Sequence, residues 1–205
     1  MREKLAVVIS YLMHPLLMPT YLFGLLLFVY PEYYRPLNSE QVTYIILRLS
    51  IVTLFLPALS ISILKFTGYI GSVHLEKRSE RLMPYLFTSL YYGVLIYIFY
   101  QGMSFRPFLI LMLSMGSLIL VLALFNFRIK VSAHAASLTG VLGILWGIKL
   151  NDPELSMLYP VVAVIMTIGI VMSARLQLNA HRPLEIYLGA ILGFIVCFCG
   201  VFFFI

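Results

Sequence analysis

Long apolar runs alternate with short polar segments along this chain. A run of about 17–25 apolar residues is long enough to cross the hydrocarbon core of a bilayer as a helix. The pattern predicts seven such spans, near residues 5–29, 42–68, 84–101, 106–126, 133–149, 155–173 and 184–205. Because the connections are short, we expect an all-α fold, a polytopic transmembrane helical bundle of six to seven spans. Residues 1–205 then form a single integral-membrane domain.

Two prolines, Pro15 and Pro19, lie inside the first predicted span. Proline lacks a backbone donor and clashes with the preceding turn, so we expect the first span to be kinked or partly re-entrant. With seven spans, alternate loops face opposite sides of the membrane. One side then carries the N-terminus and the loops near 69–83, 127–132 and 174–183.

The composition agrees with a membrane protein. Only 11% of residues are charged, whereas a soluble domain has about 25%. The net charge is +6, and the basic residues cluster at span ends. This arrangement fits membrane topology and anionic headgroups better than nucleic acid, so we expect a phospholipid bilayer as partner and no nucleic acid. Cys197 and Cys199 have a spacing that suits neither zinc nor a disulfide.

Three polar segments on the same side each come directly before a predicted helix. Their notable side chains are Lys77 and Arg81, then Ser132 and His134, then Arg175, His181 and Glu185. Helix N-termini carry unpaired N–H groups and the positive end of the helix dipole, so three of them together favour an anion. Arginine adds a fork that matches the geometry of phosphate oxygens.

The last segment contains a pair suited to covalent catalysis. His181 and Glu185 are four residues apart, so their side chains can touch on one helix face. A carboxylate on one ring nitrogen leaves the other nitrogen free to attack phosphorus. His134 can supply an acid, because an unperturbed histidine has a pKa near 6.5. The pattern fits hydrolysis of a phosphate ester through a phosphohistidine.

The order of these segments resembles the three signatures of the type-2 phosphatidic acid phosphatase superfamily, which also contains the vanadium haloperoxidases. Those signatures read K-x6-R-P, P-S-G-H and S-R-x5-H-x3-D. The segment from Arg175 to Glu185 has the spacing of the third signature, with glutamate in place of aspartate. Ser132 and His134 match the second, and Lys77 with Arg81 matches the first in chemistry but at a shorter spacing.

The resemblance implies a role for each matching residue. His181 would be the phosphorylated nucleophile, and Glu185 would orient it. His134 would protonate the leaving alkoxide and later activate water. The expected phosphate ligands are Lys77, Arg81, Ser132 and Arg175. No metal and no cofactor are implied.

The expected substrate is a membrane lipid phosphate or diphosphate, whose headgroup reaches the site while its tail stays in the lipid. Candidates are phosphatidic acid, phosphatidylglycerol phosphate, a polyprenyl phosphate or diphosphate, and a lipid A phosphate. We expect an integral membrane protein of a bacterial inner (cytoplasmic) membrane. Charge counting favours a cytoplasmic active face, whereas many bacterial members of the superfamily work on the opposite side, so both sides stay open.

Other interpretations fit the same residues. A lipid phosphotransferase would use the same phosphohistidine with a lipid acceptor, and a non-catalytic membrane protein would bind anionic lipid at a decayed site. The cations near Lys77 could form a solvated loop, and Ser132 could serve only as a helix cap. His181 and Glu185 could belong to a structural ion-pair cluster. His14 could bond a carbonyl freed by the Pro15 kink, or it could reach the site.

Overall fold

The structure, a computed structural model of the chain, describes residues 3–30, 37–75, 77–102 and 106–205. Within these ranges all regular structure is helical. The elements are α1 (Glu3–Leu12), the 3₁₀ turn η1 (Pro15–Leu17), α2 (Met18–Val29), α3 (Ser39–Ser50), the π-helical turn η3 (Ile51–Phe55), α4 (Leu56–Phe66), the 3₁₀ turn η4 (Arg78–Glu80), α5 (Leu82–Gly102), α6 (Arg106–Asn126), α7 (Ala133–Asn151), α8 (Leu158–Gln177) and α9 (Pro183–Phe202).

Within the described residues, seven helical segments are long and apolar enough to cross a membrane, which makes the chain an integral membrane protein. They are Glu3–Val29, Ser39–Phe66, Arg78–Gln101, Arg106–Asn126, Ala133–Asn151, Leu158–Gln177 and Pro183–Phe202. The predicted helical bundle is therefore confirmed. The sixth segment lies a few residues later than expected, because the helix continues through Arg175 after the apolar run has ended.

The first segment is broken at Pro15, as its prolines predict. His14 has an extended backbone, with φ −66° and ψ 139°, and a 3₁₀ turn follows before α2 begins at Met18. The N–H of His14 bonds to the carbonyl of Tyr11 instead of that of Ser10. The break therefore leaves the Ser10 carbonyl without the partner that a continuous α-helix would supply.

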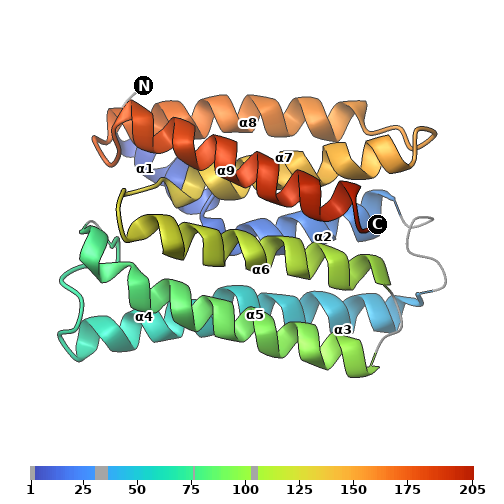
Figure 1. Cartoon of the computed structure of the whole chain (residues 1–205), viewed down its shortest axis with the longest axis horizontal. Coiled ribbons are helices and arrows are strands. Elements are labelled where there is room, and N and C mark those ends of the chain that lie inside the picture. The colour runs from blue at the N-terminus through green and yellow to red at the C-terminus, as the bar shows by residue number, and fades with distance from the viewer. Residues whose placement is uncertain (1–2, 31–36, 76, 103–105) are drawn as a thin grey trace.

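The closest helix pairing in the bundle joins α7 and α9, whose backbones touch at glycines. A Cβ atom at Gly193 would lie 2.0 Å from the carbonyl oxygen of Ala136. A Cβ atom at Gly189 would lie 2.6 Å from that of Ser132. Small residues allow such approaches between membrane helices. As Figure 1 shows, α9 crosses in front of α7, with α8 on one side of the pair and α6 on the other.

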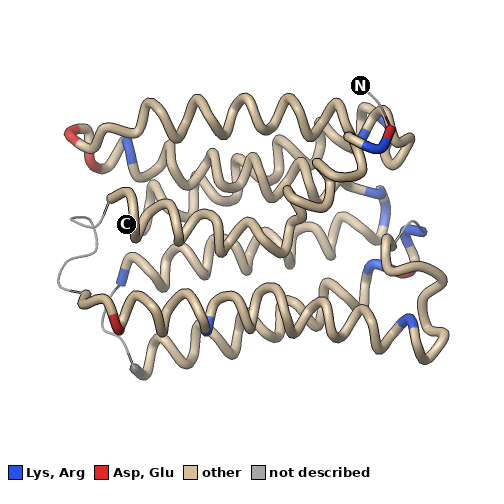
Figure 2. Tube along the Cα trace, turned by 180° about the vertical axis from the view of Figure 1, so that it is seen from behind, with Lys and Arg blue, Asp and Glu red and all other residues tan. Residues whose placement is uncertain are grey.

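The predicted grouping of loops is present at one end of the bundle. The N-terminus lies there beside the connections between α4 and α5, α6 and α7, and α8 and α9 (Figure 1). We call this the motif end. Lysine and arginine residues gather at this same end in Figure 2, whereas Asp152 and Glu154 occupy the turn before α8 at the opposite end.

Candidate functional site

The side chains of His181 and Glu185 form a close pair where α9 begins. Nδ1 of His181 lies 2.7 Å from Oε2 of Glu185. His181 is in the short connection before α9, and Glu185 is in the first turn of that helix. The contact expected from their four-residue spacing is therefore present. A carboxylate only accepts, so Nδ1 carries the proton and Nε2 keeps its lone pair.

The surroundings of His181 favour a neutral ring. The residue is 7% exposed. Burial, followed by the positive charges of Arg81, Lys130 and Arg175, lowers the pKa of His181 below its ordinary value. Glu185 favours the charged ring, but the net shift of the His181 pKa is downward. At neutral pH the ring is consequently uncharged, the state in which an imidazole nitrogen is a nucleophile.

Ser132 connects the second polar segment to the third. The residue is fully buried and caps α7, with its Oγ accepting from the N–H of Ala135 at 3.4 Å. Its backbone N–H donates to the carbonyl of Glu185 at 3.0 Å. The capping role expected for Ser132 is therefore present, and the same residue fixes the start of α7 against the start of α9.

His134 lies in the first turn of α7 and reaches α1 across the site. Its Nε2 lies 3.1 Å from the carbonyl oxygen of Ser10, the carbonyl that the Pro15 break leaves free. Because a carbonyl only accepts, Nε2 carries the proton and Nδ1 is the nitrogen available for proton transfer. His14 packs edge-on against this ring, with centroids 5.5 Å apart and planes at 82°.

Two arginines approach the same space but use their donors differently. Arg81 is 6% exposed, and it donates to the carbonyls of Leu75 and Val131, both at 2.9 Å. It braces the first polar segment against the second. Arg175 has an unused donor, because its buried Nε has no hydrogen-bond partner within the described residues. An unpaired donor on a cation is costly to bury, and an anion would satisfy it.

One cavity of about 1060 Å³ brings most of these groups together. The histidine, lysine and arginine side chains that line it are His14, His74, Arg81, Lys130, His134, Arg175 and His181. Ser10 also lines it, and the buried Oγ of that residue has no partner within the described residues. Away from the motif end, the lining becomes apolar.

A second cavity of about 360 Å³ lies against the connection between α8 and α9. Lys130, Asn179, Ala180 and His181 line both cavities. Nζ of Lys130 donates to the carbonyl of Ala180 at 3.0 Å and holds this connection against the one before α7. Arg182 lines the smaller cavity only and is exposed. His181 is thus accessible from two sides.

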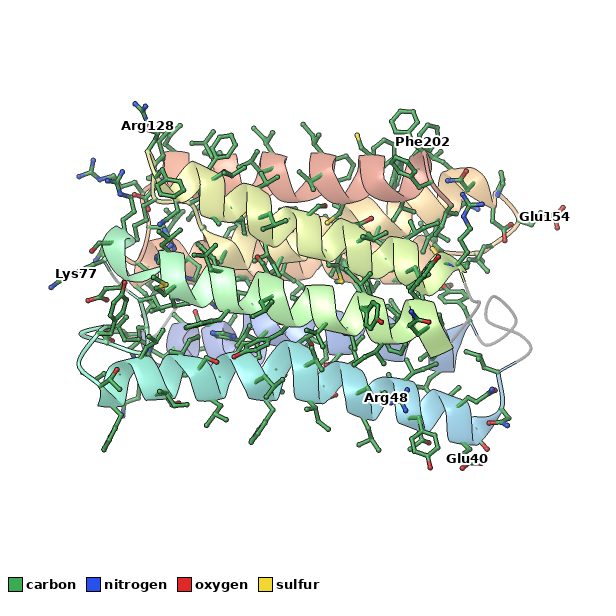
Figure 3. All side chains as sticks on the ribbon, turned by 60° about the horizontal axis from the view of Figure 1, so that its bottom comes forward. Glu40, Arg48, Lys77, Arg128, Glu154 and Phe202 are labelled. Carbon is green, nitrogen blue, oxygen red and sulfur yellow. The ribbon has the colours of Figure 1, made fainter. Side chains whose placement is uncertain are left out.

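Of the seven residues expected to form the site, Lys77 lies outside both cavities. It is exposed, and its side chain extends away from the bundle in Figure 3. Lys77 therefore fits the solvated loop that the sequence left open as an alternative. Glu185 lines the smaller cavity, and His134, Arg81, Arg175 and His181 line the larger. Ser132 lines neither, so its place is in the scaffold behind them.

Two residues join the site that the matching motifs did not include. Lys130 precedes Ser132 by two positions on the same cation-rich side, and that closeness was a usable signal. His14 had a weaker signal, a histidine directly before a proline inside an apolar span. Its bond is to the N–H of Leu16, at 3.3 Å to Nδ1. His14 therefore does not use the freed carbonyl, which belongs to His134.

No protein-family model matches this chain, and no curated protein or solved structure matches it significantly.

Proposed function

We propose that this protein hydrolyses the phosphate ester of a membrane lipid through a phosphohistidine at His181, without a metal ion. One observation carries the proposal. The imidazole held by Glu185 opens into the same cavity as the guanidinium of Arg175, whose Nε has no partner within the described residues. A nucleophile and an unsatisfied cation that face one space are the minimum that phosphoryl transfer requires.

In the first step, Nε2 of His181 attacks phosphorus, and the bond from phosphorus to the ester oxygen breaks. The departing oxygen takes a proton from Nδ1 of His134, which gains that proton when the negatively charged phosphate binds. Arg175 and Arg81 balance the charge on the remaining phosphate oxygens. The proton on Nδ1 of His181 stays on the ring, hydrogen-bonded to Glu185, whose carboxylate stabilises the positive charge of the ring.

In the second step, water attacks the phosphorus of the phosphohistidine. Nδ1 of His134, now neutral, takes a proton from that water as the bond from nitrogen to phosphorus breaks. The products are inorganic phosphate and free His181. His134 is again protonated, so atoms and charges balance over the cycle.

Two features favour a lipid substrate and hydrolysis over transfer. The larger cavity extends from the cations at the motif end into the apolar interior of the spanning helices. The smaller cavity gives His181 a separate approach beside the exposed Arg182, which suits water and departing phosphate. The family resemblance that suggests this chemistry also suggests a bacterial inner membrane.

The test is phosphate release by the detergent-purified protein from a panel of lipid phosphates in EDTA, compared with His181→Ala. We expect release by the wild type and none by the variant. A reaction with phosphate-labelled substrate, quenched in alkaline detergent, should leave an acid-labile, base-stable label on the protein, and His181→Ala should lack it. Release that survives in the double variant His134→Ala, His181→Ala would contradict the mechanism.

The same assay separates the two alternatives. Label that appears on a second lipid and not in solution would favour the phosphotransferase. No turnover, with binding of anionic lipid that survives His181→Ala, would favour a non-catalytic lipid-binding protein. Arg128→Ala is a suitable control, because Arg128 is an exposed cation at the same end that lines neither cavity.

A further inference from the structure

The larger cavity is deep compared with a phosphate group. Its lining reaches Tyr92 in α5, Met115 in α6 and Cys197 in α9. Cys197 comes 12 residues after Glu185 in a continuous helix, which corresponds to about 18 Å along the axis. The cavity therefore extends from the motif end to around the middle of the spanning helices.

The deep part of this cavity is mainly apolar. The α6 residues that line it are Met115, Leu118, Ile119 and Leu122, while η3 adds Leu54 and α4 adds Ile61. Water has few hydrogen-bond partners among such side chains, whereas a hydrocarbon chain would gain contacts with all of them. Ligand sites of this kind have a mainly apolar wall with a few polar groups at one end.

The cavity also has a side that faces the surroundings of the bundle. Val7 and Tyr11 of α1, with Ala58 and Ser62 of α4, line the cavity and are all exposed. These four residues lie within candidate spans. The two helices pack on different partners, α1 on α8 and α4 on α5, and they lie apart in Figure 1. The opening between α1 and α4 therefore faces the bilayer.

We infer that the hydrocarbon chain of an anionic lipid enters the bundle sideways between α1 and α4 and occupies the apolar part of this cavity. The inference rests on the proposed function, and it replaces the expectation that the tail stays in the lipid. The chain exchanges one apolar environment for another, so little hydrophobic free energy opposes the transfer. Its phosphate then reaches Arg175 and His181 from the membrane, while water uses the smaller cavity.

The first test narrows the opening with Ala58→Trp and uses Ala163→Trp as the matched control. Ala163 is an exposed alanine of α8 that lines neither cavity. The substrates are dioleoyl phosphatidic acid in mixed micelles and water-soluble 4-nitrophenyl phosphate. We expect Ala58→Trp to raise KM for the lipid about tenfold or more, with kcat and soluble-substrate turnover unchanged. Ala163→Trp should change neither reaction.

If Ala58→Trp lost the hydrolysis of both substrates equally, or left lipid hydrolysis unchanged, the inference would be overturned. A wild type that hydrolyses neither substrate would contradict the proposed function, and a second measurement decides the inference in that case. Phosphatidic acid with a diazirine at the end of one acyl chain is photo-cross-linked to the full chain in vesicles. Label on the α6 segment around Met115 supports the inference, whereas label confined to lipid-facing residues such as Leu120 and Leu124 contradicts it.

Discussion

The backbone N–H of Ser132 donates to the backbone carbonyl of Glu185 across 3.0 Å. This single bond joins the first turn of α7 to the first turn of α9. It sets the ring of His134 relative to that of His181, although 47 positions separate the two residues in the sequence. The glycines of α9 make the bond possible, because they let the two backbones come into contact.

The close packing of α7 on α9 predicts strong sensitivity to a single methyl group. In Gly193→Ala, the new Cβ would lie 2.0 Å from the carbonyl oxygen of Ala136, so the helices must separate. We expect a loss of roughly 1–3 kcal/mol in stability, which is the usual cost of overpacking. Gly169→Ala in α8 is the control, since its Cβ meets no atom within 4 Å. Thermal unfolding in detergent should show a lower Tm for Gly193→Ala only.

The contact between His181 and Glu185 predicts that the charge of Glu185 matters for kcat. Glu185→Gln keeps the size of the side chain but lets the amide favour the wrong tautomer of the ring. We expect kcat to fall by about 10²- to 10⁴-fold with a small change in KM. Glu185→Asp keeps the charge and should recover part of the loss. If Glu185→Gln has wild-type kcat, the carboxylate does not orient the nucleophile.

The unpaired Nε of Arg175 predicts that removing this side chain lowers activity but does not lower stability. Arg175→Ala removes a buried donor without a partner, so the apo protein should keep its Tm or gain slightly. Its kcat/KM should fall by about 10²-fold or more as phosphate contacts are lost. Inorganic phosphate should raise the Tm of the wild type but not that of Arg175→Ala. A stabilisation by phosphate that persists in the variant would place the anion elsewhere.

The lowered pKa of His181 predicts a dependence of stability on pH with a definite sign. Below about pH 6.5 the unfolded ring binds a proton that the folded ring does not, so acid favours unfolding. The contribution of neutral His181 to stability is fully present above the pKa of the ring in the unfolded chain. It is lost as the pH falls towards the pKa of the ring in the folded protein. We expect at most about 1.4 kcal/mol per pH unit from this residue. When the pH is lowered from 8 to 5, the Tm of His181→Asn should fall less steeply than the Tm of the wild type.

The ring of His14 against that of His134 predicts a supporting role for His14. Such contacts are worth about 0.5–1.5 kcal/mol, which corresponds to about 2- to 10-fold in rate. His14→Phe preserves the ring, whereas His14→Asn preserves only a cap for the 3₁₀ turn. We therefore expect kcat of His14→Phe to stay closer to the wild type. The opposite order would mean that a proton on His14, and not its packing, is what His134 requires.

The spans and the contact between His181 and Glu185 could be predicted from the sequence because both depend on local spacing. Apolar length defines a span, and a four-residue interval places two side chains together. The bond from His134 to Ser10 could not be predicted, since it joins positions 124 apart and requires a specific break before Pro15. Lys77 was expected at the site because it is a cation beside the other motifs. Whether a loop cation faces the cavity depends on the three-dimensional path of the loop, which the residue type does not reveal.

The order of elements has a consequence for the biogenesis of the protein. Of the seven candidate spans among the described residues, six precede His181 in the chain. At the usual speed of translation, on the order of ten seconds separates the synthesis of Arg81 from that of Glu185. During that interval the membrane-inserted chain would carry the cations that attract an anionic lipid, but not the group that reacts with it. Under the proposed function, insertion of the hairpin formed by α8 and α9 is therefore the step that would turn a lipid-attracting intermediate into an active protein.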